Sequence, residues 1–195
     1  SGSLTLRRIT VSGGGIGVYN LGTLDVADST FSNNQGGAIY NSGMLTVNGS
    51  TFDHNSAAQH GGAIYNTLGG AAITNSTFSA NVAGGTGGAI YSYYTSARSL
   101  TNNHFCGNSA TYGGGVYSYY NYGTTDVWEN NVFQENTGTS YGGAVYSVYD
   151  YYTDFTNNTV VESNETFGLL VQRNTTDSTS TYLAKSTFSI LNDDT

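Results

Sequence analysis

The same short blocks of residues recur along this chain at intervals of 21 to 29 residues. One block reads Gly-Gly-Ala-Ile-Tyr, occurs unchanged three times, and has looser copies on either side. The Tyr residues that end the six copies are Tyr19, Tyr40, Tyr65, Tyr91, Tyr117 and Tyr146. A period of about 20 to 50 residues is the sequence signature of repeat architectures, in which each unit packs on its neighbours. The chain is therefore expected to form a stack of similar units.

A second block places an apolar residue three positions before an Asn. The five clear copies are Phe31 with Asn34, Phe52 with Asn55, Phe78 with Asn81, Phe105 with Asn108, and Phe133 with Asn136. Ile9, Val160 and Phe188 extend the apolar series in weaker form. We expect the Phe side chains to stack inside as one column. The Asn side chains are expected to form a hydrogen-bonded ladder at a turn, where Asn tolerates a left-handed backbone.

Short stretches in which polar and apolar residues alternate, such as Thr-Leu-Asp-Val-Ala-Asp, lie between these blocks. Alternation with period two is typical of strands, and the absence of Pro suits a chain whose backbone N–H groups are used in sheets. Three short strands in about 25 residues make one coil of a parallel β-helix. Within the first block, alternation places Ile39, Ile64 and Ile90 inside and the flanking Ala and Tyr outside.

We expect a single β-helix domain over residues 1–195, with about seven to eight coils of 21–29 residues. The approximate coils are 3–22, 23–43, 44–69, 70–97, 98–123, 124–152 and 153–179, with a partial terminal coil at 180–195. The coils differ in length mainly in two turns, one before the Gly pair and one after the Tyr.

The order of the two blocks resembles the repeats of polymorphic outer-membrane proteins, and of right-handed parallel β-helix proteins more widely. Gly-Gly-Ala-Ile is exact at Gly36, Gly61 and Gly87, and the Phe-x-x-Asn block is exact five times. The resemblance covers about residues 4–170. It implies a fold that is all-β, a single-stranded right-handed parallel β-helix. It also implies an extracellular or cell-surface rod with a role in adhesion or surface structure.

The charge balance excludes some partners. The chain has 13 Asp and Glu against 5 Lys and Arg, a formal charge of −8, and only 9% of its residues are charged. Such a chain repels phosphate backbones and anionic lipid, so we expect no nucleic-acid partner. No apolar run approaches the roughly 18 residues of a membrane span, so we expect no membrane insertion by this segment. The single Cys106 excludes a disulfide framework within the chain.

A carbohydrate-active enzyme, either a polysaccharide lyase or a glycoside hydrolase, is the alternative function. Glycoside hydrolysis needs two carboxylates about 5 to 10 Å apart. Asp126, Glu129 and Glu135 are near one another in sequence, and Asp150 and Asp154 follow one coil later. This alternative predicts a groove lined by these acids.

We expect no catalytic, metal or cofactor site. The pair Asp53-His54 occupies a position in the repeat that other coils fill with Ser, Asn or Ala, so it is interpreted as repeat variation. The three His residues are dispersed, without the Cys or acid spacing of a zinc site. Ice binding would need regular outward rows of Thr, and Thr46 and Thr74 have no consistent partners in the repeat.

The Tyr residues are the most informative surface feature. The candidate contact residues are Tyr40, Tyr65, Tyr91, Tyr117, Tyr146, Tyr94, Tyr120, Tyr122, Tyr151 and Tyr152. Tyr combines a flat apolar ring with a polar tip, which suits contact with protein or with sugar. The structural alternative is that the rings stack on one another and shield the sheet. Five sequons also occur, at Asn48, Asn75, Asn157, Asn164 and Asn174, and they would be N-glycosylated in a secretory eukaryote.

Two structural roles fit these features. The chain is either a segment of a longer surface adhesin or a subunit that stacks head-to-tail into filaments, since the ends of a β-helix have unpaired strand edges. The expected partners are thus copies of the same chain, in end-to-end or lateral contact, or a longer parent chain. Carbohydrate is an alternative partner.

Overall fold

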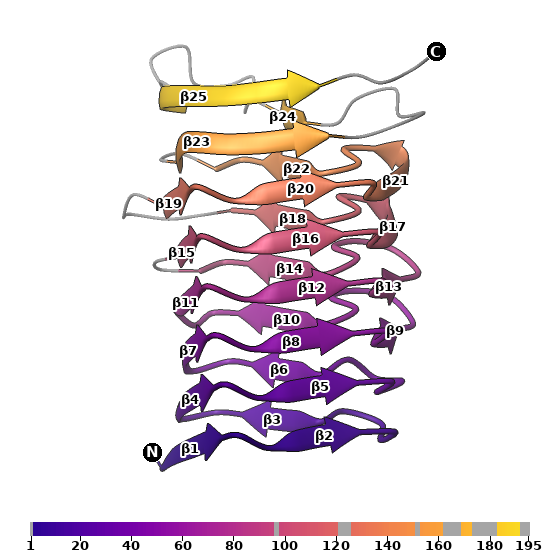
Figure 1. Cartoon of the computed structure of the whole chain (residues 1–195), viewed down its shortest axis with the longest axis vertical. Helices are drawn as coiled ribbons and strands as arrows, with labels where there is room; N and C mark the ends of the chain where they lie inside the picture. Colours follow the sequence, from indigo (N-terminus) through magenta and orange to yellow (C-terminus); the bar gives the residue numbers. More distant parts are fainter. Residues whose placement is uncertain are drawn as a thin grey trace.

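The computed structural model describes residues 2–95, 98–120, 126–150 and 153–161, and the backbone of residues 169–172 and 183–191. These residues contain 25 strands and no helix. Strands of successive coils pair in parallel and build three sheets along a rod (Figure 1). The predicted all-β parallel β-helix is confirmed.

Sheet A has two halves. Its first half contains β1 (Ser3–Arg7), β4 (Thr23–Ala27), β7 (Met44–Asn48), β11 (Ala71–Thr74), β15 (Arg98–Thr101) and β19 (Asp126–Glu129). Its second half contains β2 (Thr10–Ser12), β5 (Thr30–Ser32), β8 (Thr51–Asp53), β12 (Thr77–Ser79), β16 (His104–Cys106) and β20 (Val132–Gln134). The long strand β23 (Thr153–Val161) pairs with both β19 and β20 and so joins the halves, and β25 (Leu183–Leu191) pairs with β23.

Two further sheets complete the coils. Sheet B contains β3 (Val18–Asn20), β6 (Ile39–Asn41), β10 (Ile64–Thr67), β14 (Ile90–Tyr93), β18 (Val116–Tyr119), β22 (Val145–Val148) and β24 (Leu169–Gln172). Sheet C contains β9 (Ser56–Ala57), β13 (Val82–Ala83), β17 (Ser109–Tyr112) and β21 (Thr137–Tyr141). Sheet C lies in the turn between sheet A and sheet B, where the number of residues differs between coils.

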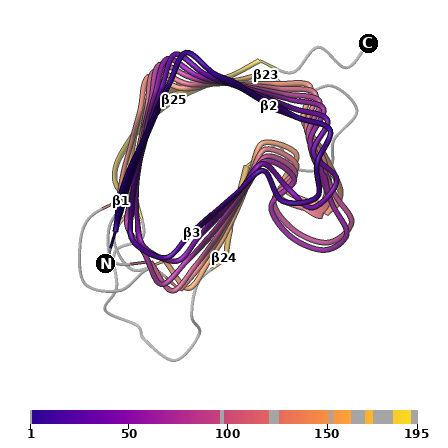
Figure 2. The ribbon, with the colours of Figure 1, turned by 90° about the horizontal axis from the view of Figure 1, so that it is seen from below.

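The coil is right-handed. In Figure 1 the front strands β2, β5 and β8 point to the right, and the more distant strands β3, β6 and β10 point to the left. The chain rises from its N-terminus at the bottom, which gives a right-handed path. Viewed along the rod, the coils superimpose and the chain turns inward just before β3 (Figure 2).

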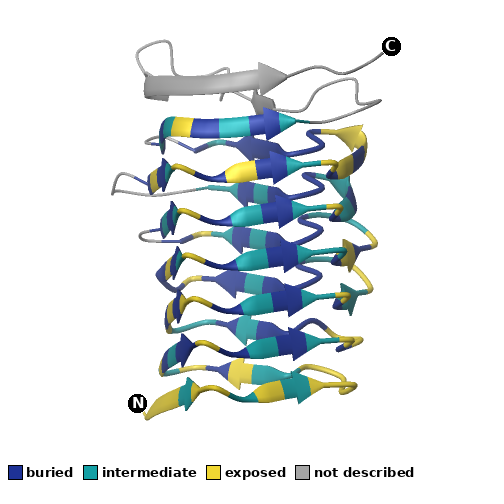
Figure 3. Cartoon of the chain, viewed as in Figure 1, coloured by how far each residue is buried: buried dark blue, intermediate teal, exposed yellow. Residues whose placement is uncertain are grey.

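Buried positions recur at similar places in successive coils (Figure 3), and the side chains at these positions form the columns of the core. Phe31, Phe52, Phe78, Phe105 and Phe133 are fully buried and stack with ring centroids 4.8 to 5.1 Å apart. The Ile residues of the first block are buried beside them, in register on sheet B. The apolar positions of the repeat thus form one continuous core.

Three predictions about individual core positions were wrong. The strand register aligns Val11, not Ile9, with Phe31, and it aligns Ile190, not Phe188, with Val160. The Ala residues of the first block were expected outside, but Ala38 and its equivalents are fully buried in the core. These Ala residues precede the strands of sheet B, where the chain is still turning, so the two-residue alternation does not yet apply.

The predicted asparagine ladder is present. Each ladder Asn donates from Nδ2 to Oδ1 of its equivalent in the next coil, over 2.8 to 3.0 Å, from Asn34 through to Asn136. The expectation of a left-handed backbone at these Asn residues was wrong. The residue before each of them has the positive φ, for example Asn33 at 56° and Ala80 at 51°. The ladder Asn is instead fixed by bonds to the neighbouring backbone, as where Asn81 Nδ2 donates to the carbonyl oxygen of Phe52.

Two further polar ladders lie at the other corners. One runs through Ser29, Ser50, Ser76, Asn103, Asn131 and Asn158, each of which accepts a bond from the backbone N–H of the preceding member. The other connects Asn20, Asn41 and Asn66 through their side-chain amides and continues to Ser92. All of these residues are buried. Buried polar groups are tolerated here because each has a partner in the adjacent coil.

Candidate interaction surface

Sheet B carries a row of Tyr side chains on its outer face. Tyr19, Tyr40, Tyr65, Tyr91, Tyr117 and Tyr146 pair in register from β3 to β22. Neighbouring ring centroids are 4.4 to 5.5 Å apart, and the first five rings stack face to face. Tyr points outward because the alternate positions of the same strands hold the buried Ile and Val residues.

Additional rings widen this row in the upper coils. Tyr93 and Tyr119 lie in register with Thr67 and Val148, and their ring centroids are 5.7 Å apart. At the following corner Tyr120 contacts Tyr94 on one side and Tyr149 on the other. On the sheet C side the His60 ring stacks on Tyr91 at 4.7 Å, and Tyr112 and Tyr141 contact Tyr146. We call these rings, together with the row on sheet B, the tyrosine band.

The tyrosine band is uncharged. No described strand of sheet B or sheet C contains Asp, Glu, Lys or Arg. Burial lowers the pKa of His60, so that its ring is neutral near pH 7. The exposed charged pair Arg7–Asp25 and the acids Asp53 and Glu129 lie instead on sheet A. Among the described strands, the charged side chains therefore lie on sheet A, and none lies on sheet B or sheet C.

The rings of the band hold one another in place. Burial raises the pKa of Tyr91 and Tyr117, and the neighbouring phenols raise it further. The same causes raise the pKa of Tyr40, Tyr65 and Tyr146, so these hydroxyls remain protonated at ordinary pH.

Because the stacked rings cover each other's faces, the row offers a partner its ring edges and hydroxyl groups. Self-stacking, the structural alternative for the Tyr residues, is thus what the structure shows for the row.

Most predicted contact residues belong to the band, and some that belong to it were not predicted. Tyr122, Tyr151 and Tyr152 lie outside the described residues. His60, Tyr112 and Tyr141 join the band from the sheet C side and were missed. A signal for them exists, because each immediately precedes the Gly pair of its coil.

A buried ionic cluster lies inside the upper coils. Arg98 donates to Oδ2 of Asp126 from Nε at 2.6 Å and also from Nη2, and Nη2 lies 3.4 Å from Oδ2 of Asp150. Ser118 and Ser147 donate to the same oxygen of Asp150. The Arg98 guanidinium also lies over the Trp128 ring, at 5.2 Å. Burial and the nearby Asp150 carboxylate raise the pKa of Asp126 to about 6 against the opposing effect of Arg98.

The acids of the enzyme alternative do not converge on one groove. Asp126 and Asp150 are buried in this cluster, Glu129 and Asp154 lie outside on sheet A, and Glu135 is at an exposed corner with a φ of 52°. The prediction of a groove lined by all five acids was therefore wrong.

The pair Asp53-His54 does not form a nucleophilic triad. Asp53 accepts from Ser79 at 2.5 Å and lies 2.8 Å from His54 Nδ1. The acid thus lies between the hydroxyl and the imidazole. A triad needs the imidazole between them, so that it can take the proton of the hydroxyl.

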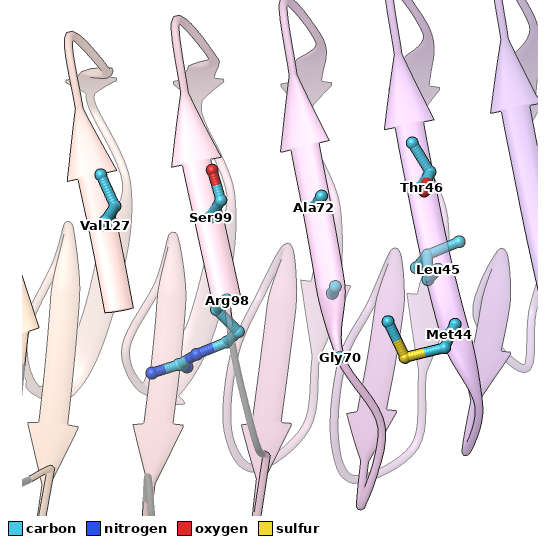
Figure 4. A pocket seen from close by; sticks show the side chains of 9 residues that line it. Met44, Leu45, Thr46, Gly70, Ala72, Arg98, Ser99 and Val127 are labelled. Carbon is cyan, nitrogen blue, oxygen red and sulfur yellow. The ribbon is translucent and has the colours of Figure 1, made fainter. Parts of the chain in front are cut away.

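Two shallow hollows lie on the outer face of sheet A. The larger has a volume of about 420 Å³ and lies over Ala72, between Met44 and Thr46 on one side and Ser99 and Val127 on the other (Figure 4). It arises because Ala is the smallest side chain in that outward row. The smaller, of about 160 Å³, is lined by Val127, Glu129, Asp154 and Thr156.

The register shows one outward row of Thr that was not foreseen. Thr46 pairs with Asp25 and Ala72, as expected for a residue without Thr partners, whereas Thr74 pairs with Asn48 on one side and with Thr101 on the other. However, Thr10, Thr30, Thr51 and Thr77 align in four successive coils on the second half of sheet A. The row ends at His104, which pairs with Thr77. A row this short and partly buried does not form the regular Thr array that ice binding requires.

Three of the five sequons fall on described residues. Asn48, Asn75 and Asn157 are exposed, and Asn75 and Asn157 both occupy a corner with positive φ. Asn75 Nδ2 donates to Oδ1 of Asn48 at 2.9 Å, so these two sites would compete for space if modified. Asn164 and Asn174 lie outside the described residues. Glycosylation stays a prediction, and an intact mass equal to that of the bare 20.5 kDa chain would refute it.

Neither a metal cluster nor a membrane helix is found in the part of the chain that the structure describes. No group of three or more His, Cys, Asp or Glu residues is arranged there to hold a metal ion. No helix within the described ranges has the length and apolar character needed to cross a membrane.

A family model supports the resemblance seen in the sequence. Residues 49–67, 75–93 and 132–148 match the Chlamydia polymorphic membrane protein repeat. Each matched segment contains one strand with a stacked Phe, a ladder Asn and the following strand of sheet B. Comparison with curated proteins and with solved structures found no match. The repeats associate the chain, in coarse terms, with surface and outer-membrane proteins. The chain is a right-handed parallel β-helix protein, and three of its segments are similar to the repeat of Chlamydia polymorphic membrane proteins.

Proposed function

We propose that this protein is a non-enzymatic rod on the outside of the cell, with a role in adhesion or surface structure. The observation that carries the proposal is the division of the rod into a charged side and the tyrosine band. An uncharged surface of rigid rings and hydroxyls is suited to contact with another molecule, since Tyr gives a large contact area with little loss of side-chain entropy. The repeats of polymorphic membrane proteins support a location at the surface.

Two arrangements of the rod are compatible with this role. In the first, the described coils are a segment of a longer adhesin. In the second, copies stack head-to-tail into filaments. Strands β1, β2 and β3 have a partner strand on one side only, and Leu4, an inward position in register with Leu24, is 49% exposed. A preceding coil of a longer chain or the last coil of a second copy would supply the missing strands.

Location and assembly can be tested together. Antibodies against the purified chain should label intact cells of the source organism, and protease added to intact cells should remove the label. Electron microscopy of the native material, with size-exclusion chromatography, would distinguish the two arrangements. Long fibres with an axial repeat near one chain length support the filament, and only short rods of uniform size support the adhesin segment. Label that appears only after the cells are permeabilised would contradict the proposal.

A further inference from the structure

We propose that the tyrosine band binds an uncharged polysaccharide that lies along the rod axis. The inference rests on the proposed function, because it names the class of partner for an adhesive surface. The principal contact residues are Tyr91, Tyr93, Tyr117 and Tyr119 on β14 and β18, where two rows of rings lie side by side.

Charge determines the class of polysaccharide. The strands under the band carry no charged residue, so no cation is available there to pair with a uronate, sulfate or phosphate group. The chain has a net charge of −8, which repels anionic polymers of any kind. A polysaccharide that carries hydroxyl groups but no charge needs no cation for binding and is not repelled by the net charge of the chain.

The repeat of the band favours a polymer over a single sugar. Rings of the sheet B row recur once per coil, with centroids 4.4 to 5.5 Å apart, and each coil presents the same phenol group. A polysaccharide also presents the same hydroxyl groups once per residue, so contacts made with one coil can recur on the next. Several weak contacts on one chain add to a strong total affinity, whereas a monosaccharide gains only one of them.

Ring packing prepares the band for binding. Tyr93 contacts Tyr91, Tyr94 and Tyr119, and Tyr119 contacts Tyr117, Tyr120 and Tyr149. Side chains already held by their neighbours lose little rotational freedom when a partner arrives. Since the ring faces in the sheet B row are covered, recognition must use hydroxyl hydrogen bonds and ring edges. This mode requires many contacts in a row, which again selects long chains.

The variant that tests the band is the double substitution Tyr93→Thr and Tyr119→Thr. Thr67 occupies the register position of Tyr93 in the coil below, so Thr is accommodated there by the same fold. The matched control is Val127→Ser on sheet A, an exposed side chain whose register partner is Ser99. Unchanged circular dichroism and an unchanged urea midpoint would show that both variants fold.

The experiment is affinity electrophoresis of the purified chain in native gels. The gels contain hydroxyethyl cellulose, laminarin, galactomannan or glycogen as uncharged probes, and polygalacturonate or alginate as anionic ones. We expect at least one uncharged polysaccharide to retard the protein, to the same extent at low and high salt, and neither anionic polymer to do so. The double variant should bind about tenfold more weakly, because one of the two rows loses two rings and two hydroxyls, and the control variant should bind normally.

Three results would overturn the inference. These are no retardation by any of the four uncharged probes, equal binding by the double variant, and tighter binding to the anionic probes. Sedimentation velocity gives a further test: a concentration-dependent dimer that the double variant loses would make the band a contact between copies of the chain. These outcomes concern only the partner of the band. The proposed surface role stands or falls separately, by the labelling of intact cells.

Discussion

Arg98 donates from Nε to Oδ2 of Asp126 over 2.6 Å, with both side chains almost fully buried inside the rod. In the two coils below, the register position of Arg98 is held by Ala71 and Leu45. The pair therefore breaks the symmetry of the repeat. If a coil slipped past its neighbour by one repeat, Phe would still meet Phe and Asn would meet Asn. Arg98 or Asp126 would then face an apolar side chain. We infer that the cluster fixes which coil stacks on which, as buried polar groups do in other repetitive folds.

Substitution of Asp126 by Ala should lower the free energy of unfolding by about 3–5 kcal/mol, because it leaves the Arg98 guanidinium buried without its main partner. Urea denaturation followed by circular dichroism measures the loss. Asp154→Ala is the matched control, since Asp154 lies on the adjacent strand of the same sheet and faces outward. Its effect should stay within about 0.5 kcal/mol.

The triple variant Arg98→Ala, Asp126→Leu and Asp150→Asn should recover most of that stability, because it removes all three buried charges and restores at the first two positions the residue types found in the lower coils. A loss below about 1 kcal/mol for Asp126→Ala alone would contradict the assigned role of the pair.

The proton affinity of the cluster gives a second prediction. Two carboxylates share one guanidinium, and burial with the charge of Asp150 raises the pKa of Asp126 from 3.8 to about 6. The folded state therefore holds this proton more tightly than the unfolded chain does. The resulting stabilisation is fully present below about pH 4 and is lost as the pH rises through about 6. Carbon-13 NMR of the Asp126 carboxyl should show a midpoint near 6, and a midpoint at or below 4 would refute the assignment.

The sequence predicts the architecture well because the repeat marks each coil twice. The Phe of the second block fixes an inward position, and the Asn three places later fixes the corner that follows. At two of the three positions that lack this Asn, the register error is two residues, whereas Val160 is correctly assigned. Ile9 and Phe188 were assigned to the Phe column but occupy the corner position held by Ser29 and Asn158 in other coils.

The candidate site was predicted only in part. The Tyr row follows from simple alternation in strands of sheet B. The absence of charge around it depends on which strands share a sheet, and that is a property of the folded coil. The ionic cluster was not predicted, because Arg98, Asp126 and Asp150 are far apart in sequence and come together only when three corners stack. The two acids of the cluster, Asp126 and Asp150, were instead interpreted from the sequence as candidates for catalysis.

Removal of one member of the asparagine ladder should be costly. Asn81 accepts from the backbone and the side chain of Asn55 and donates to Asn108 and to the carbonyl of Phe52. Asn81→Ala leaves several buried groups without partners, so we expect a loss of about 2–4 kcal/mol in urea denaturation. Asn33→Ala is the matched control, because the equivalent left-handed corner already holds Ala80. A control variant as unstable as Asn81→Ala would show that corner geometry, and not the ladder, carries the energy.

The tyrosine band gives a prediction at alkaline pH. Burial and neighbouring phenols raise the pKa of Tyr91 and Tyr117 well above the ordinary value of 10. Since the folded state retains these protons more tightly, their contribution to stability is present below pH 10 and is lost as the pH rises further. Absorbance at the phenolate band should therefore show a late step, above pH 10, in which Tyr91 and Tyr117 ionise. This late step should coincide with the loss of the circular dichroism of the sheets. Ionisation of all Tyr residues in one step near pH 10, with the fold intact, would contradict the packing of the band.

The double variant Tyr93→Thr and Tyr119→Thr should shift the late ionisation step to lower pH, because it opens Tyr91 and Tyr117 to water.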